Sequence, residues 1–162
     1  MASSVALAEA VFEAHQVSPS VSADDSPTFV KEHGIFYQEN DAIGSLVDQV
    51  KPGVDSLERF KPTLHADARA IRILEPFLVN PPEKYFALGS DPGHFFVSTT
   101  AENQDDRLLV YMWPAGTRLE FFDKSHKEAK GVRAANGLFE APYPFLKRRY
   151  GPEIEINMER GG

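Results

Sequence analysis

The hydrophobic pattern of this chain changes at Asn80-Pro81-Pro82, and this change constrains the fold more than any other sequence feature. Before it, apolar residues recur at the three- and four-residue spacing of amphipathic helices. After it, short segments rich in aromatic and β-branched residues are separated by turns that contain glycine and proline. The sequence therefore predicts an α+β fold, with helices in the first half and an antiparallel sheet in the second.

The N-terminal 27 residues are expected to lie outside the main domain. Ser3 or Ser4 can cap a helix that runs to about Gln16, and a polar, proline-containing stretch over residues 17–27 then predicts a mobile linker. Residues 28–162 are expected to form one α+β domain, a size that can bury its own core.

Four segments of the first half carry further patterns. Residues 66–74 fit a helix, but the alternation of Ile71 and Ile73 also fits a strand. The other three predictions are a short strand or core entry over Phe29–Gln38, a helix capped by Asp41 that runs to Val50, and a short helix over Val54–Phe60.

The second half predicts several strands, of which one pair forms a hairpin. Leu108 to Trp113 is continuously apolar, Arg118 to Phe121 alternates, and Pro114-Ala115-Gly116 supplies a three-residue turn between them. Further strands are expected over Tyr85–Leu88, Phe95–Thr100, Leu138–Glu140 and, half-buried and antiparallel, Glu153–Met158.

Composition excludes several classes of function. The chain has no cysteine, so disulfides, thiolate zinc sites and a cysteine nucleophile are ruled out. Its net charge of −7, with most of the excess acid in the first half, disfavours nucleic-acid binding. No apolar run is long enough for a membrane span and the N-terminus is a poor signal peptide, so we expect a cytoplasmic protein with no membrane contact.

Histidines supply the main candidates for chemistry. In an extended segment, His65 and Asp67 would project from one face and supply two ligands of a facial iron triad, with His94 or His126 as the third. On a helix the pair would diverge and could not chelate. His126 also fits a general base beside Asp123 or a surface histidine, and His94 fits a turn residue.

Two groups of basic residues fit either solvated surface or a patch that binds an anionic ligand. They are Lys124, Lys127, Lys130 and Arg133, and the run Lys147-Arg148-Arg149. His15 and His33 have no convergent partner in the sequence and receive no role.

One stretch resembles phytanoyl-CoA dioxygenase-like proteins, in which a Leu-x-Val strand leads into a Pro-Gly-Ser-His turn. Here Leu119 and Phe121 stand in the strand, and Asp123-Lys124 replaces Pro-Gly before Ser125-His126. His65 and Asp67 precede this stretch, as the His-x-Asp ligand pair does in that family. Residues 155–162 are similar to the approach to the family's distal histidine, but the distal histidine region itself is missing.

The resemblance implies a jelly-roll, or double-stranded β-helix, and a non-haem oxygenase dependent on Fe(II) and 2-oxoglutarate that acts on a small organic substrate. Its metal ligands would be His65, Asp67 and His126. One alternative is a non-catalytic, degenerate jelly-roll protein that binds a small molecule or a protein partner. The other is a small cofactor-free α+β cyclase or isomerase that uses a buried His and Asp as acid and base.

Overall fold

The computed structural model describes residues 18–50, 56–77, 94–97, 108–127, 131–133 and 139–162. Its helices are α1 (Ser26–His33), α2 (Asp41–Gln49), α3 (Ser56–Ala66), α4 (Ala68–Leu74) and α5 (Tyr143–Tyr150), with single 3-10 turns at Ser18–Ser20, Glu75–Phe77 and Ser125–Lys127. Its strands are β1 (Phe95–Val97), β2 (Thr117–Phe121), β3 (Val132–Arg133), β4 (Phe139–Ala141) and β5 (Ile154–Met158).

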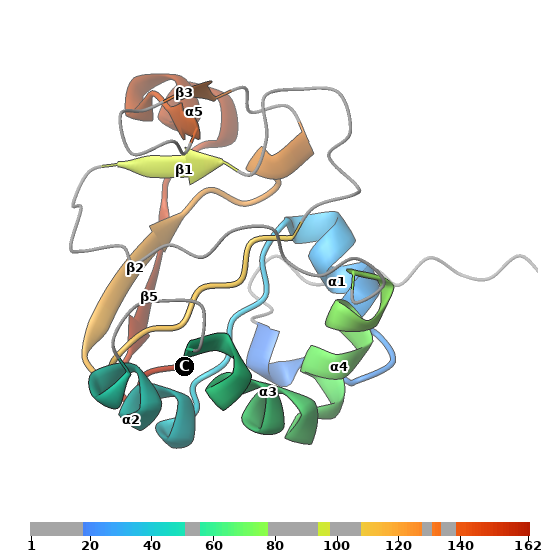
Figure 1. Cartoon of the computed structure of the whole chain (residues 1–162). Coiled ribbons are helices and arrows are strands. Elements are labelled where there is room, and N and C mark those ends of the chain that lie inside the picture. Colours follow the sequence, from blue (N-terminus) through green and yellow to red (C-terminus); the bar gives the residue numbers. More distant parts are fainter. Residues whose placement is uncertain (1–17, 51–55, 78–93, 98–107, 128–130, 134–138) are drawn as a thin grey trace, which may run out of the picture.

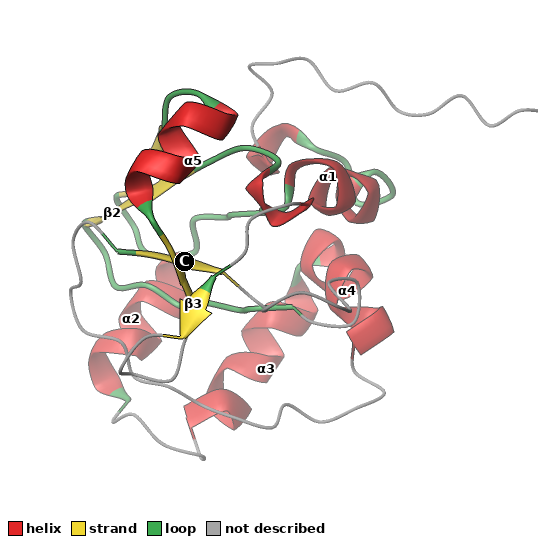
Figure 2. Ribbon diagram, turned by 90° about the horizontal axis from the view of Figure 1, so that it is seen from above, coloured by secondary structure: helices red, strands yellow, loops and turns green. Residues whose placement is uncertain are grey.

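Helices in the first half and antiparallel strands in the second confirm the α+β prediction. Figure 1 shows α2, α3 and α4 at one end of the molecule, and α5 with β1 and β3 at the other. In the view from above, α5 again lies on the opposite side of the strands from α2 and α3 (Figure 2). None of the described helices is long and apolar enough to cross a membrane.

Local capping explains where the first-half helices begin and end. The Asn40 side chain accepts hydrogen bonds from the backbone N–H groups of Ala42 and Ile43, which fixes the start of α2. Helix α1 ends at Gly34, whose positive φ of 77° lets its N–H bond the Val30 carbonyl. The segment 66–74, which fitted a helix or a strand, is helical from Ala68 to Leu74, because Asp67 caps α4 in the same manner.

Each of the four helices α1 to α4 contributes one buried apolar side chain to a helical core. These are Phe29, Ile43, Phe60 and Ile73, all at most 8% exposed. Burial of a side chain of this size stabilises the fold by about 1.5–3 kcal/mol. Residues 18–27, expected as a linker, are packed against the helices, since Ser18, Val21 and Ser26 are all buried.

Two small antiparallel sheets form the second half. Strand β4 lies between β1 and β3, and β2 pairs with β5 from Thr117 opposite Met158 to Phe121 opposite Ile154. A second core of Phe122, Ala141 and Leu146 lies beneath α5, and Phe95 packs against it. Strand β5 faces inward through Ile156 and Met158, which confirms the half-buried strand predicted there.

The predicted hairpin between residues 108–113 and 118–121 is wrong. The partner of β2 is β5, and residues 108–112 belong to no strand. Trp113 instead pairs with Gly162, each donating a backbone hydrogen bond to the other, at 2.7 and 3.1 Å. The turn at Gly116 therefore does not fold the chain back on itself, because both its flanks pair with the same distant segment.

Of the two predictions for Phe29–Gln38, the strand is replaced by α1 and a segment that belongs to no strand, whereas an entry into the core agrees with Phe29, which is 3% exposed. The helix predicted over Val54–Phe60 is longer, ending at Ala66. Strand β1 falls within the predicted strand Phe95–Thr100, and β4 overlaps the predicted strand Leu138–Glu140 and extends it to Ala141. The N-terminal helix to Gln16 and the strand over Tyr85–Leu88 lie outside the described residues.

Candidate functional site

The structure does not place His65 and Asp67 together on one extended segment, as the predicted metal site would need. His65 is exposed in the last turn of α3, and Asp67 is the N-cap of α4. The Asp67 carboxylate already accepts hydrogen bonds from the backbone N–H groups of Arg69 and Ala70, at 2.8 and 3.0 Å, and from the Gln38 side chain at 2.6 Å. Its oxygen atoms hold the helix start in place.

The other two candidate histidines lie in different surroundings. His126, in the turn Ser125–Lys127, places Nε2 3.0 Å from the Lys31 carbonyl oxygen at the end of α1. His94 places Nδ1 2.9 Å from Glu140 in β4. Among the described residues no group of three His, Asp or Glu side chains could hold a metal ion. His65, Asp67 and His126 do not fit a facial triad in this arrangement, and the iron and 2-oxoglutarate predictions stay predictions.

His33, to which the sequence assigned no role, forms a half-buried pair with Asp123. Its Nδ1 lies 2.8 Å from Asp123 Oδ1, and its ring stacks on Phe29 with 4.4 Å between centroids. The two partners are 90 residues apart, so no local sequence signal could have joined them. Together with the His126 contact, this pair fastens the turn after β2 to the end of α1.

The structure describes only part of the two groups of basic residues. Two of their lysines form ion pairs with glutamates. Lys124 Nζ lies 3.9 Å from Glu32, and Lys147 Nζ lies 3.5 Å from Glu153 and donates to the Tyr143 hydroxyl at 2.8 Å. Lys130 is outside the described residues. These ion pairs favour the solvated-surface interpretation of both lysines.

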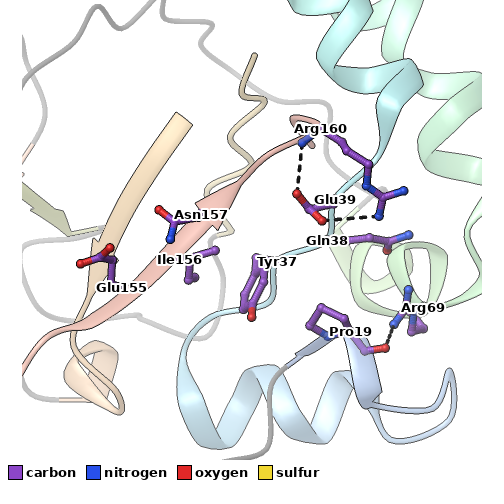
Figure 3. Close-up of a pocket in the computed structure, with 9 residues that line it drawn as sticks. All are labelled: Pro19, Tyr37, Gln38, Glu39, Arg69, Glu155, Ile156, Asn157 and Arg160. Carbon is purple, nitrogen blue, oxygen red and sulfur yellow. Dashed lines mark hydrogen bonds and ion pairs between the residues drawn. The ribbon is translucent and has the colours of Figure 1, made fainter. Parts of the chain in front are cut away.

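A pocket of about 350 Å³ opens between the extended segment after α1, the start of α4 and β5. Figure 3 shows Tyr37 near its centre, with Glu155 and Asn157 on the β5 side and Arg160 with Glu39 on the other. Its lining consists of Pro19, Tyr37, Gln38, Glu39, Arg69, Glu155, Ile156, Asn157 and Arg160. Residues from four separate parts of the chain meet here, and none of the sequence candidates is among them.

Each charged side chain of the pocket has a partner of opposite charge. Arg160 pairs with Glu39 at 3.4 Å, and Arg118 donates to Glu155 at 2.5 Å. Arg69 lies 3.6 Å from Asp67, and it also donates to the Pro19 carbonyl at 2.7 Å. The pocket therefore presents compensated charges and no isolated ion.

The surroundings of Glu39 and Tyr37 shift the pKa values of both side chains. The backbone N–H of Arg160 donates to Glu39 and, with the Arg160 charge, lowers the pKa of that carboxyl. Burial, and to a smaller degree the Glu39 charge, raises the pKa of Tyr37 above its ordinary value of 10.0. The Tyr37 phenol is therefore protonated at neutral pH, and it presents an O–H group to the pocket.

Two polar groups of the pocket are available to a ligand. Within the part of the chain that the structure describes, neither the Tyr37 hydroxyl nor the Asn157 carboxamide forms a hydrogen bond. Both groups donate and accept hydrogen bonds. The alternation of β5 could have indicated that Glu155 and Asn157 share a face, but nothing in the sequence connects them with Tyr37 or Arg69.

No known family, curated protein or solved structure matches this chain in the three comparisons made. The resemblance to phytanoyl-CoA dioxygenase-like proteins therefore stays a prediction.

Proposed function

We propose that this protein is a non-catalytic binding protein for a small, uncharged, hydroxyl-rich molecule, held between Tyr37 and Asn157. The observation that carries the proposal is the contrast within the pocket: its charges are compensated, while a phenol and a carboxamide remain available. A ligand with net charge would have to compete with an existing ion pair. A hydroxyl group, which donates and accepts, matches both available groups without disturbing any pair.

The dimensions of the pocket support a ligand of this kind. A volume of about 350 Å³ lies at the lower end of the range for small-molecule sites. The ring of Tyr37 supplies apolar surface against which the carbon skeleton of such a molecule can pack. The charged pairs around them supply further hydrogen-bonding atoms at the rim.

The jelly-roll scaffold is part of the same proposal. The antiparallel pairing of β2 with β5, and of β1 and β3 with β4, supports it together with the family resemblance of residues 116–127. The ligand would then lie beside the β2–β5 ladder, where Glu155, Ile156 and Asn157 line the pocket.

The test is a binding screen by NMR with named probes. Myo-inositol and glucose represent neutral polyols, glycine represents zwitterions and 2-oxoglutarate represents dianions. We expect a polyol to shift the Asn157 side-chain resonances, and Asn157→Ala to weaken its binding about fivefold, the cost of one hydrogen bond of ~1 kcal/mol. Gln49→Ala removes an exposed carboxamide of α2 outside the pocket and should leave affinity unchanged.

Three kinds of outcome would contradict the proposal. In the first, only 2-oxoglutarate binds, or no probe shifts the Asn157 or Tyr37 resonances. In the second, anaerobic addition of Fe(II) and 2-oxoglutarate produces a visible charge-transfer band that is lost in His65→Ala and Asp67→Ala. That second result would support the oxygenase prediction and show that these residues rearrange on binding. Turnover that survives a chelator but requires a His-Asp pair would support the cyclase or isomerase prediction.

A further inference from the structure

Gln38 lines the pocket and is also bonded to a helix cap. Its Nε2 atom donates a hydrogen bond to Asp67 Oδ2 at 2.6 Å, which joins the segment after α1 to the start of α4. In Figure 3 the Gln38 side chain lies on the same side of Tyr37 as Arg69 and Arg160. One carboxamide is therefore in contact with the α4 cap and borders the space that we assign to a ligand.

The two carboxylate oxygens of Asp67 have separate partners. Oδ1 accepts hydrogen bonds from the backbone N–H groups of Arg69 and Ala70, at 2.8 and 3.0 Å, and so caps α4. Oδ2 accepts from Gln38, and the Arg69 guanidinium lies 3.6 Å from it. The pKa of this carboxyl is lowered, so Asp67 is ionised at neutral pH and only accepts hydrogen bonds. Capping and the contact with Gln38 are thus separable functions of one side chain.

The contact with Asp67 determines which way round the Gln38 carboxamide lies. A half-turn that exchanged Nε2 and Oε1 would place the amide oxygen against a carboxylate oxygen, with no proton between them. The NH2 group therefore faces Asp67, and Oε1 is held away from it. Within the described part of the chain Oε1 has no hydrogen bond, so it is available to a pocket ligand as an acceptor.

We propose that Gln38 is a specificity-determining residue of the pocket and that Asp67 is its positioning residue. Gln38 Oε1 accepts a hydrogen bond from a ligand hydroxyl, which narrows the ligands to polyols with a free hydroxyl at that position. An ether or a fluorine there has no proton to donate and leaves Oε1 unsatisfied. Tyr37 and Asn157 both donate and accept, so they do not make this distinction. The inference rests on the proposed function and defines its ligand more closely.

Replacements of Asp67 separate the cap from the orientation of Gln38. Asn and Ser are both good N-cap residues, so Asp67→Asn and Asp67→Ser should retain α4 and the ellipticity at 222 nm. The Asn side chain has an NH2 group where Asp67 has Oδ2, so the Gln38 carboxamide should turn round and present its own NH2 group to the ligand. The Ser side chain has no group at that place and fixes neither orientation.

The test compares hydroxyl with fluorine in the ligand. Myo-inositol and glucose are each titrated by NMR beside analogues in which one hydroxyl is replaced by fluorine. We expect at least one analogue to bind the wild type about fivefold more weakly than its parent. The same analogue should bind Asp67→Asn at least as tightly as the parent does, and Asp67→Ser should give an intermediate ratio. Gln49→Ala, outside the pocket, should keep the wild-type ratio.

A measurement without ligand distinguishes failure of this inference from failure of the proposed function. In the ligand-free protein, the side-chain NH2 resonances of Gln38 should differ between the wild type and Asp67→Ser, while those of Gln49 stay the same. No difference would overturn the inference alone, as would polyol binding with the same fluorine ratio in all Asp67 variants. If neither polyol binds, the proposed function and this inference fall together.

Discussion

Gly161 allows a close approach between the end of the described chain and α2. A Cβ on Gly161 would lie 2.6 Å from the Gly44 Cα and 2.7 Å from the Trp113 carbonyl oxygen. Gly161 also has a positive φ of 76°, as does Gly116 with 78°, but no atom lies within 4 Å of a Cβ built on Gly116. The two glycines therefore share backbone strain on substitution and differ only in packing.

Gly161→Ala is expected to destabilise the protein more than Gly116→Ala. Both variants place alanine in left-handed backbone, at a cost of about 1–2 kcal/mol. Gly161→Ala adds overpacking against α2, worth about 1–3 kcal/mol more. Urea denaturation measures the difference directly. Equal losses in the two variants would show that the contact between Gly44 and Gly161 is not tight in solution.

Asp67 makes the stability of the fold depend on pH. Burial by itself raises the pKa of this carboxyl. The hydrogen bonds from Ala70, Gln38 and Arg69, with the Arg69 charge, more than offset that effect and lower the pKa below its ordinary value of 3.8. A lowered folded-state pKa means that the stabilisation is complete above the unfolded pKa and is lost as pH falls through the folded one.

We therefore expect Asp67→Ala to cost about 0.5–2 kcal/mol at pH 7, as for the loss of a helix cap, and less below pH 3. Unfolding free energies at pH 7 and pH 2.5 give this comparison. The control is Asp24→Ala, because the Asp24 side chain is 85% exposed and its ion pair with Arg72 lies on the surface. The same loss at both pH values would show that the Asp67 carboxylate is not preferentially ionised in the fold.

At the scale of elements, β5 contributes residues both to the buried core and to the lining of the pocket. Ile156 is 4% exposed, whereas Ile154 in the same strand is 39% exposed. Ile156→Ala is expected to cost about 2–4 kcal/mol through lost burial and a cavity, and Ile154→Ala less than about 1 kcal/mol. Denaturant midpoints of the two variants measure this. Equal costs would mean that Ile154 and Ile156, which share one face of β5, are buried to the same extent in solution.

Local patterns predicted elements well and pairings poorly. The apolar stripe of α2 and the alternation of β5 are properties of consecutive residues, so the sequence showed both. The predicted partner of β2 was wrong. A three-residue turn after an apolar run is compatible with a hairpin, and also with two flanking segments that both pair with one distant segment. Only the register with residues 154–162 distinguishes the two arrangements. The His33–Asp123 pair and the pocket were missed for the same reason, since each joins residues far apart in the chain.

At the scale of the whole molecule, two cores share one connecting ladder. Phe29, Ile43, Phe60 and Ile73 form the helical core, and Leu146 belongs to the core beneath α5. The β2–β5 ladder extends from the α5 end of the molecule toward α2 (Figure 1). This arrangement predicts that the two cores unfold together.

Leu146→Ala tests this coupling. Leu146 is 2% exposed, so the variant should lose about 2–5 kcal/mol. Trp113, the only tryptophan, lies at the other end of the ladder beside Gly162, and its fluorescence reports on that end. We expect the fluorescence transition to shift as far as the ellipticity at 222 nm. A fluorescence midpoint that stays in place while ellipticity shifts would show two independent units.

The contact of residues 160–162 with the extended segment before α2 has a consequence for biosynthesis. Arg160 donates its backbone N–H to Glu39, 121 residues earlier in the chain. At about 5–20 residues per second, a ribosome needs roughly 6–24 s to make the intervening polypeptide. During that interval the emerged helices lack the segment that closes against Gly44 and Asn40, so this contact forms only after Gly161 has left the ribosome.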